Sequence, residues 1–402
     1  MKTASLNVDY NFNYFIALVR SVLNETEPEL PSQNVDWNMI YSIAAAHSMA
    51  AVLRCAVEKL PKEKKPPENI TAFLNQLYGE QMVTDINLTV ETERISNLLD
   101  SVGICSMPFK GIVTKKDYPA SCLRSMSDVD ILYRPENRAE VERIMLSEGY
   151  TKESIGVKDT SFRKDGILHF EMHTSLLEEE SPAYSYFLDI WSRAVFSSNN
   201  KACMNIDDTY IFMLEHLANH LIFGGAGVRM YCDIYLFLKK HSEDINREYV
   251  NKILKSILLS EFEKETVSLC NSWFSPGADP DLNTDIAEFV LNSATFGRVS
   301  VHFASEVLRK KAEITNSATI NGVFRIIIKL FPTVKRMKLY YKAVDKLPVL
   351  YPVFLLVFWI DRAFVKRNIR TKNIGAYFIS DDSDAIKELK SIYAKLGLNK
   401  RL

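Results

Sequence analysis

The chain has 402 residues, of which 47% are hydrophobic and 25% charged, with 14 glycines and 14 prolines. These values are ordinary for a globular protein and exclude disordered, fibrous and peptide-sized chains. The formal net charge of −1 does not by itself indicate an anionic partner. The six cysteines are scattered without a C-x-x-C pair, and the N-terminal stretch MKTASLNVDYNFN lacks an apolar signal-peptide core. Both features predict a reducing, cytoplasmic setting.

The first region, residues 1–88, is predicted to be helical. The segment WNMIYSIAAAHSMAAVLRCAVEKL is rich in Ala, Leu and Met and has apolar residues at helical spacing. Pro61 and the stretch KKPPEN then interrupt the pattern.

Residues 89–185 show a different pattern, in which helices alternate with short apolar strands. A helix VETERISNLLDSV precedes the strand ICSMPF, and Lys110-Gly111 follows it. Next come the strand DVDILY, a helix that ends at Gly149, and a hairpin whose return strand is ILHFEMHTSL. Strands mixed with helices in this order predict a small α/β or α+β core.

After this core the pattern is helical again, with a domain expected over 186–310 and a basic region over 311–402. Two helices are predicted on either side of the Gly224-Gly225 turn. The predicted fold class is therefore α+β: a small mixed sheet embedded in predominantly helical N-terminal and C-terminal regions.

The C-terminal region is strongly basic. Between Arg309 and Lys372 there are 15 Lys and Arg against three acidic residues, a local excess of 12 positive charges. This asymmetry predicts contact with an anionic partner, such as RNA, phosphates or a membrane surface. The longest apolar run, Val353–Ile360, is too short to span a bilayer, which needs about 20 residues. It is either a buried helix or an interfacial anchor with a basic flank.

Two aspartates stand one residue apart at the start of DVDILY. Successive side chains of a strand point to opposite faces, so Asp128 and Asp130 project together. Two carboxylates at this spacing can converge on a pair of divalent cations and would otherwise repel each other. Mg²⁺ prefers such oxygen ligands. The alternative is that one aspartate caps the loop and the other lies at a solvated strand end.

The return strand ILHFEMHTSL strengthens the metal hypothesis. Its alternation places Leu168, Phe170 and Met172 on one face, and the other face carries His169, Glu171 and His173. Glu171 is a candidate third metal ligand. A zinc site built from His169 and His173 is the competing hypothesis, because imidazole suits Zn²⁺.

These motifs together resemble the polymerase-β-type nucleotidyltransferase superfamily. The resemblance rests on Lys-Gly before a helix, on R-x-x-x-D-x-D-I-L, on a helix ending in Gly-Tyr, and on the strand H-F-E-M-H. It is greatest to a poorly characterised bacterial branch, "uncharacterised nucleotidyltransferases", and extends over about residues 35–370, including the stretch EHLANHLIFGGAGVRMYCDIYLFL.

The resemblance implies a metal-dependent enzyme that moves an NMP from an NTP to an acceptor hydroxyl and releases pyrophosphate. Carried over by position, Asp128, Asp130 and Glu171 would hold Mg²⁺ or Mn²⁺. The chain departs from the superfamily at the phosphate-binding turn, where FKGIV offers one glycine after a lysine. Lys110 and Gly111 are candidate phosphate-binding residues. Arg124 either binds phosphate as well or forms a salt bridge with a neighbouring acid.

Four further residues lie on helical faces on either side of the glycine turn. His216 and His220 are four residues apart, as are Arg229 and Asp233. Leu217 stands where a metalloprotease motif needs glutamate, which excludes that class. A packed histidine and an intrahelical ion pair are one interpretation. In the other, His220, Arg229 and Asp233 line the cleft beside the metal site, together with His169 and His173.

A non-catalytic protein that retains the fold and binds a nucleotide or a partner is the alternative function. Three acids that repel phosphates unless metal is present argue against it. The sequence leaves the acceptor open between a small molecule, a protein and RNA, and it predicts no transmembrane span.

Overall fold

The structure is a computed structural model that describes residues 2–156, 158–278, 285–293 and 384–401, together with Tyr351 and Leu355. Apart from those two positions, the basic segment 309–372 and the apolar run Val353–Ile360 lie outside the described residues. Within the described part of the chain, no helix combines the length and apolar character that crossing a membrane requires.

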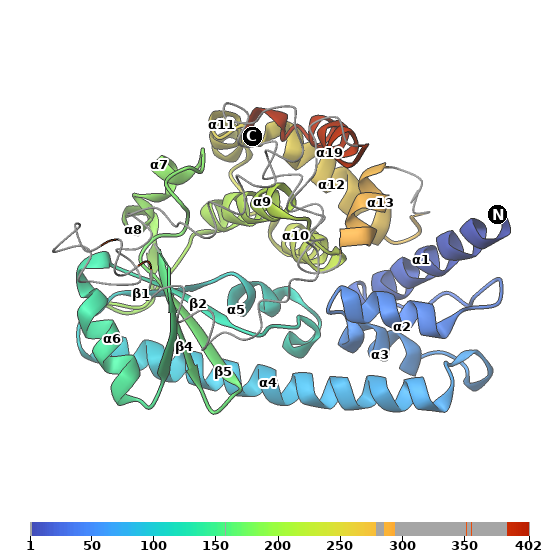
Figure 1. Cartoon of the computed structure of the whole chain (residues 1–402), viewed down its shortest axis with the longest axis horizontal. Helices are drawn as coiled ribbons and strands as arrows, with labels where there is room; N and C mark the ends of the chain where they lie inside the picture. Colours follow the sequence, from blue (N-terminus) through green and yellow to red (C-terminus); the bar gives the residue numbers. More distant parts are fainter. Residues whose placement is uncertain are drawn as a thin grey trace.

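The N-terminal region is helical, as predicted. It contains α1 (Lys2–Leu23), α2 (Trp37–Ala46), α3 (Ala50–Glu58) and the 34-residue α4 (Glu68–Ser101). Helix α4 starts directly after the two prolines that end the preceding turn, where the fixed backbone angle of proline favours a helix start. It runs without a break past residue 88, where we expected a region to end, and lies under both the N-terminal helices and the sheet (Figure 1).

The central sheet is mixed, which confirms the predicted fold class. Its strand order is β1-β2-β5-β4-β3; β2 and β5 are parallel and the other neighbours antiparallel. The predicted hairpin is β4–β5. The short helix α5 (Gly111–Thr114) follows β1, and α6 (Arg138–Ser147) follows β2. The strands are β1 (Ser106–Phe109), β2 (Val129–Tyr133), β3 (Thr151–Ile155), β4 (Asp159–Lys164) and β5 (Leu168–His173).

The two faces of the sheet have opposite chemistry because side chains alternate along each strand. Val129, Ile131, Phe170 and Met172 are fully buried against α4 and α6 in a separate core cluster. The opposite face carries the polar positions of β2 and β5. It is turned toward the helical layer, where Met107, Phe109 and Leu132 join the larger core cluster.

The helical layer contains the rest of the described chain. One core cluster joins α1–α3 to α9, α10 and α12, so the regions before and after the sheet pack as one body. The predicted helices on either side of Gly224-Gly225 are α9 and α10. The elements are α7 (Tyr184–Phe187), α8 (Ile190–Arg193), β6 (Val195–Phe196), β7 (Ala202–Cys203), α9 (Ile206–Phe223), α10 (Val228–His241), α11 (Arg247–Ser256), α12 (Ser260–Phe274), α13 (Asp285–Ser293) and α19 (Asp384–Lys395).

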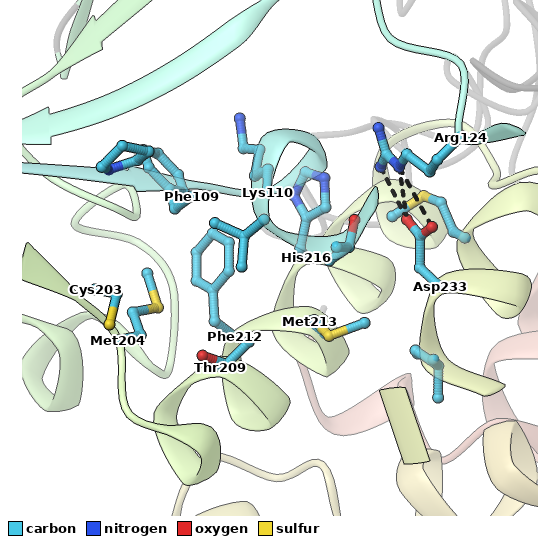
Figure 2. Close-up of a pocket in the computed structure, with 15 residues that line it drawn as sticks. Phe109, Lys110, Arg124, Cys203, Met204, Thr209, Phe212, Met213, His216 and Asp233 are labelled. Carbon is cyan, nitrogen blue, oxygen red and sulfur yellow. Dashed lines mark hydrogen bonds and ion pairs between the residues drawn. The ribbon is translucent and has the colours of Figure 1, made fainter. Parts of the chain in front are cut away.

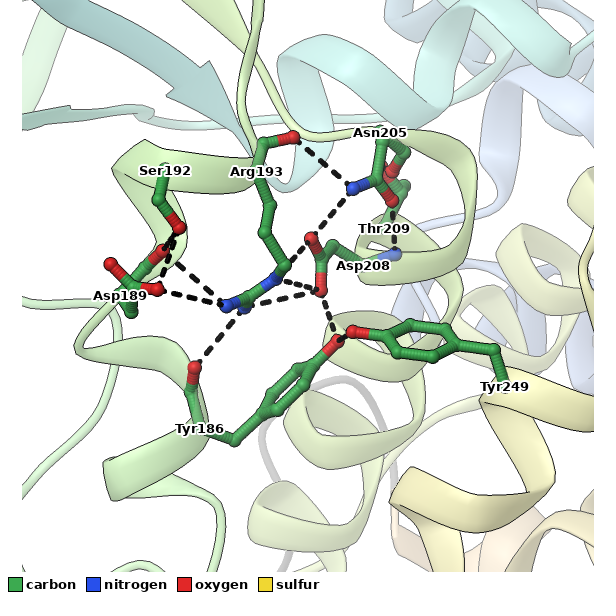
Figure 3. Close-up of polar contacts among 8 residues, drawn as sticks. All are labelled: Tyr186, Asp189, Ser192, Arg193, Asn205, Asp208, Thr209 and Tyr249. Carbon is green, nitrogen blue, oxygen red and sulfur yellow. Dashed lines mark hydrogen bonds and ion pairs between the residues drawn. The ribbon is translucent and has the colours of Figure 1, made fainter.

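A buried polar cluster fixes the start of α9 (Figure 3). Asp208 is fully buried and accepts hydrogen bonds from Arg193 Nε at 3.0 Å, from Asn205 Nδ2 at 2.8 Å and from the Tyr186 hydroxyl. Tyr249 of α11 in turn contacts Tyr186 at 2.9 Å. A buried charge with all these partners is satisfied, so this cluster positions α7, α8 and α11 around α9.

Candidate functional site

Strands β2 and β5 bring the predicted carboxylates together. In the parallel register Asp130 pairs with Glu171, and Val129 pairs with Phe170. Asp128 is the residue directly before β2, so it lies at the entrance of the same face. The structure therefore pairs Asp130 with Glu171 on two neighbouring strands and places Asp128 one residue before β2, outside the group of convergent ligand atoms formed by Asp130, Glu171 and His173.

Asp130 is buried and contacts a lysine and a histidine side chain. Lys110 Nζ lies 2.5 Å and His173 Nε2 lies 2.8 Å from its Oδ1 atom. Burial opposes ionisation of Asp130, but Lys110 and His173 outweigh it and hold the pKa of this carboxyl below its ordinary value. His173 also lies 3.5 Å from Glu171 Oε2, and its hydrogen bond lowers the pKa of Glu171. Both carboxylates are therefore ionised at neutral pH.

Asp128 has a different environment from Asp130. Burial raises its pKa, and the neighbouring charges of Asp130 and Glu171 raise it further. His169 interacts favourably with Asp128, and its Nε2 atom is buried without a hydrogen-bond partner among the described residues. A cation beside Asp128 would relieve the repulsion among the three carboxylates.

The donor set fits a hard divalent cation. Asp130, Glu171 and His173 can each offer one ligand atom, and these atoms lie within 4.8 Å of one another. Burial opposes the positive charge of His173, but its hydrogen bonds to Asp130 and Glu171 raise its pKa. The carboxylate oxygens of Asp130 and Glu171 are the ligands that Mg²⁺ and Mn²⁺ prefer. His169 is not part of this group, so the pair of imidazoles that the zinc hypothesis needs does not converge there.

The turn between β1 and α5 carries the two candidate phosphate-binding residues. Lys110 has a φ of 57° and a ψ of −132°, which a residue with a side chain rarely adopts. A Cβ atom on Gly111 would come within 2.3 Å of Arg124 Nη1 and 2.7 Å of Met126 Sδ. Any larger residue at position 111 would therefore force the side chains of Arg124 and Met126 to shift.

Of the two roles considered for Arg124, phosphate binding and a salt bridge to an acidic residue, the structure contains the salt bridge, with Asp233. Its Nη2 atom donates to Asp233 Oδ2 at 2.8 Å, and the Tyr118 hydroxyl donates to Asp233 Oδ1 at 2.7 Å. The predicted intrahelical pair is wrong, because Asp233 pairs with Arg124 and not with Arg229. Arg229 instead donates from Nη1 to the Ser125 carbonyl at 2.5 Å. Burial, and then the charge of Arg124, lowers the pKa of Arg229 to about 10.

An apolar pocket lies between the β1–α5 turn and helices α9 and α10 (Figure 2). Its enclosed part measures about 50 Å³, which is room for a few water molecules. Of the five residues in the cleft interpretation, Asp233 lines this pocket, whereas His169, His173, His220 and Arg229 do not. Its walls include Phe109, Met204, Phe212, Met213, His216 and Met230.

The two histidines of α9 differ in position. His216 lines the pocket and stacks on Phe212, with ring centroids 5.9 Å apart. His220 lies behind it, edge to face at 4.6 Å. Burial lowers the pKa of both histidines, that of His220 to about 4, so both rings are neutral at pH 7. His220 therefore fits the packed-histidine interpretation.

Two features of the site could not be read from the sequence. Lys110 contacts Asp130 because β1 and β2 pair with Phe109 opposite Asp130, and no short motif encodes that pairing. Tyr118 reaches Asp233 across more than a hundred residues. The K-G dipeptide before a helix predicted that Lys110 binds phosphate. In the structure the Lys110 side chain contacts the carboxylate of Asp130 instead.

The match to a family model agrees with the resemblance noted in the residues. Residues 33–275 match the model of a family described as uncharacterised nucleotidyltransferase, and the chain belongs to this family. The match ends at 275, short of the expected 370. No curated protein is similar in sequence. The solution structure of the antibiotic-resistance factor ANT(2″)-Ia aligns with this chain at a TM-score of 0.32 and 12% sequence identity. The alignment covers 46% of this chain and 96% of the ANT(2″)-Ia chain.

Proposed function

We propose that this protein transfers a nucleoside monophosphate from an NTP to an acceptor hydroxyl, with Mg²⁺ or Mn²⁺ bound by Asp128, Asp130 and Glu171. The observation that carries the proposal is the register of β2 and β5, which places Asp130 beside Glu171 with Asp128 at the strand entrance. Membership of a nucleotidyltransferase family is an independent support.

The proposed reaction is an in-line displacement at the α-phosphorus. The acceptor hydroxyl passes its proton to solvent water, its oxygen forms a bond to the α-phosphorus, and the bond from this phosphorus to the bridging oxygen breaks, which releases pyrophosphate. A bound divalent cation would offset phosphate charge and favour the deprotonated hydroxyl. His173 holds Asp130 and Glu171 in place through its Nε2 atom.

The acceptor would approach on the face of the sheet that points toward α9. The pocket beside the carboxylates is apolar, and its charged residues are already engaged: Arg124 with Asp233, and Lys110 with Asp130. Asp233, the carboxylate that lines this pocket, is paired with Arg124, so the pocket is poorly suited to bind a group with several positive charges. An uncharged part of the acceptor or of the nucleotide fits its walls better.

The test is pyrophosphate release from each of the four NTPs with Mg²⁺ or Mn²⁺, with a desalted cell extract as the source of acceptor. Wild type is compared with Asp130→Ala. Release that needs Asp130, together with label transferred to an extract component, would support the proposal. Absence of release with both proteins, and nucleotide binding that EDTA does not affect, would favour the non-catalytic binding protein.

A further inference from the structure

We infer that the Lys110 ammonium group is a tethered counter-ion that competes with a divalent cation for Asp130. The site would consequently take up the cation together with a triphosphate in preference to the free cation. The inference rests on the proposed function, because it assigns a role to Lys110 at the same carboxylates.

The competition follows from the contacts of one oxygen atom. Lys110 Nζ lies 2.5 Å from Asp130 Oδ1, and His173 Nε2 reaches the same atom at 2.8 Å. The ammonium charge also interacts electrostatically with Glu171 and Asp128. A divalent cation and an ammonium group repel each other at such distances. A cation that binds through this oxygen therefore has to displace Lys110.

The backbone holds Lys110 in this position. Lys110, directly after β1, has a positive φ, a conformation that normally favours glycine. A lysine side chain nevertheless occupies this position and contacts Asp130. Such conformations persist at functional sites where the surroundings fix them. Here the pairing of Phe109 with Asp130 on one side and the contact of Gly111 with Arg124 on the other fix the turn.

A displaced ammonium group needs a new anionic partner. A free divalent cation supplies no anion and would leave the Lys110 ammonium group beside two additional positive charges. A complex of the cation with a triphosphate supplies phosphate oxygens that Lys110 can contact. Arg124 cannot replace Lys110 in this role without breaking its contacts with Asp233. Lys110 would therefore exchange Asp130 for phosphate, which couples metal binding to nucleotide binding.

The experiment measures Mn²⁺ binding by the EPR signal of free Mn²⁺, with and without a non-hydrolysable α,β-methylene NTP. For Lys110→Met we expect free Mn²⁺ to bind at least about tenfold more tightly than to wild type, as for other close charge pairs. The tightening of Mn²⁺ binding by nucleotide should shrink by a similar factor. Lys201→Met is the matched control, because Lys201 is equally exposed, at 22% against 21%, and pairs with Glu93 at 2.6 Å.

Two further variants keep the outcomes separate. Lys110→Gly also removes the ammonium group and suits the positive φ, so it replaces Lys110→Met if that variant misfolds. Unchanged or weaker binding of free Mn²⁺ in these variants, with binding lost in Asp130→Asn, overturns the counter-ion inference alone. Mn²⁺ binding that is equal in wild type and Asp130→Asn overturns the proposed metal site and the inference with it.

Discussion

Asp130 and Glu171 occupy paired positions on the parallel strands β2 and β5, and His173 contacts both carboxylates. Strands β3 and β4 and helix α6 separate the two strands in the chain. Parallel pairing needs such a crossover, and its result is that two acids remote in sequence become neighbours.

Removal of metal should abolish activity, because three carboxylates on one sheet face repel a triphosphate unless a cation is bound. We expect pyrophosphate release to stop in EDTA and to return with Mg²⁺ or Mn²⁺, which prefer oxygen ligands. Zn²⁺ should not restore it, since His169 stays outside the cluster. Restoration by Zn²⁺ alone would instead favour the imidazole site.

Gly111→Ala should disturb the β1–α5 turn. The added methyl group would come within 2.3 Å of Arg124 Nη1, so the guanidinium group must shift, which would disturb its hydrogen bonds from Nε and Nη2 to Asp233. We expect weaker nucleotide binding and a loss of about 1–3 kcal/mol in the free energy of unfolding, typical of overpacking. Titration calorimetry and urea denaturation measure the two effects.

Gly79→Ala is the matched control for this substitution. Gly79 lies within α4, and nothing stands within 4 Å of an added Cβ atom. Alanine should therefore raise the free energy of unfolding, by about 0.5–1 kcal/mol, and leave nucleotide binding unchanged. Equal effects of the two substitutions would contradict the steric role of Gly111.

The protein should lose stability on acidification because His47 is buried and neutral. Its Nδ1 atom accepts from the Val228 N–H at 3.2 Å, and Nε2 lies 3.0 Å from the Leu291 carbonyl. Burial lowers its pKa to about 4. The unfolded chain, with a histidine pKa near 6.5, binds more protons below that pH, so stability falls between pH 6.5 and 4, by at most about 3 kcal/mol.

The variant His47→Gln tests the assignment of this pH dependence. It removes the titrating group, so the free energy of unfolding should depend less steeply on pH in that window. Gly79→Ala, which removes no titrating group, serves as the control and should keep the wild-type slope. An unchanged slope in His47→Gln would assign the acid sensitivity to other groups, such as His216 and His220.

The C-terminal turn should stabilise α9 through a buried ion pair. Arg401 Nη2 lies 2.6 Å from Glu215 Oε2, and their side chains are 1% and 0% exposed. Arg401→Met leaves a buried carboxylate without its cation and should cost about 3–5 kcal/mol of unfolding free energy. The double variant with Glu215→Gln should recover part of this loss in urea denaturation. A loss below about 1 kcal/mol in the single variant would show that the pair contributes little.

Local sequence patterns determined the elements and the chemistry of each strand. Strict alternation predicted that Phe170 and Met172 face the core and that Glu171 and His173 point the other way. Phe170 and Met172 are fully buried in that core cluster, but His173 is buried as well, against Phe109 on the opposite face of the sheet. The two-helix pattern around Gly224-Gly225 was also correct. These features depend on side-chain periodicity and turn residues, which the sequence contains directly.

Only the tertiary structure decided which of these residues meet. The ion pair of Arg124 with Asp233, the contact of Lys110 with Asp130, and the burial of Glu215 against Arg401 all join residues that are distant in the chain. Such contacts depend on strand order and helix packing, which arise from burying apolar surface over the whole chain. A sequence motif therefore predicts what a side chain can do, whereas packing decides which partner it finds.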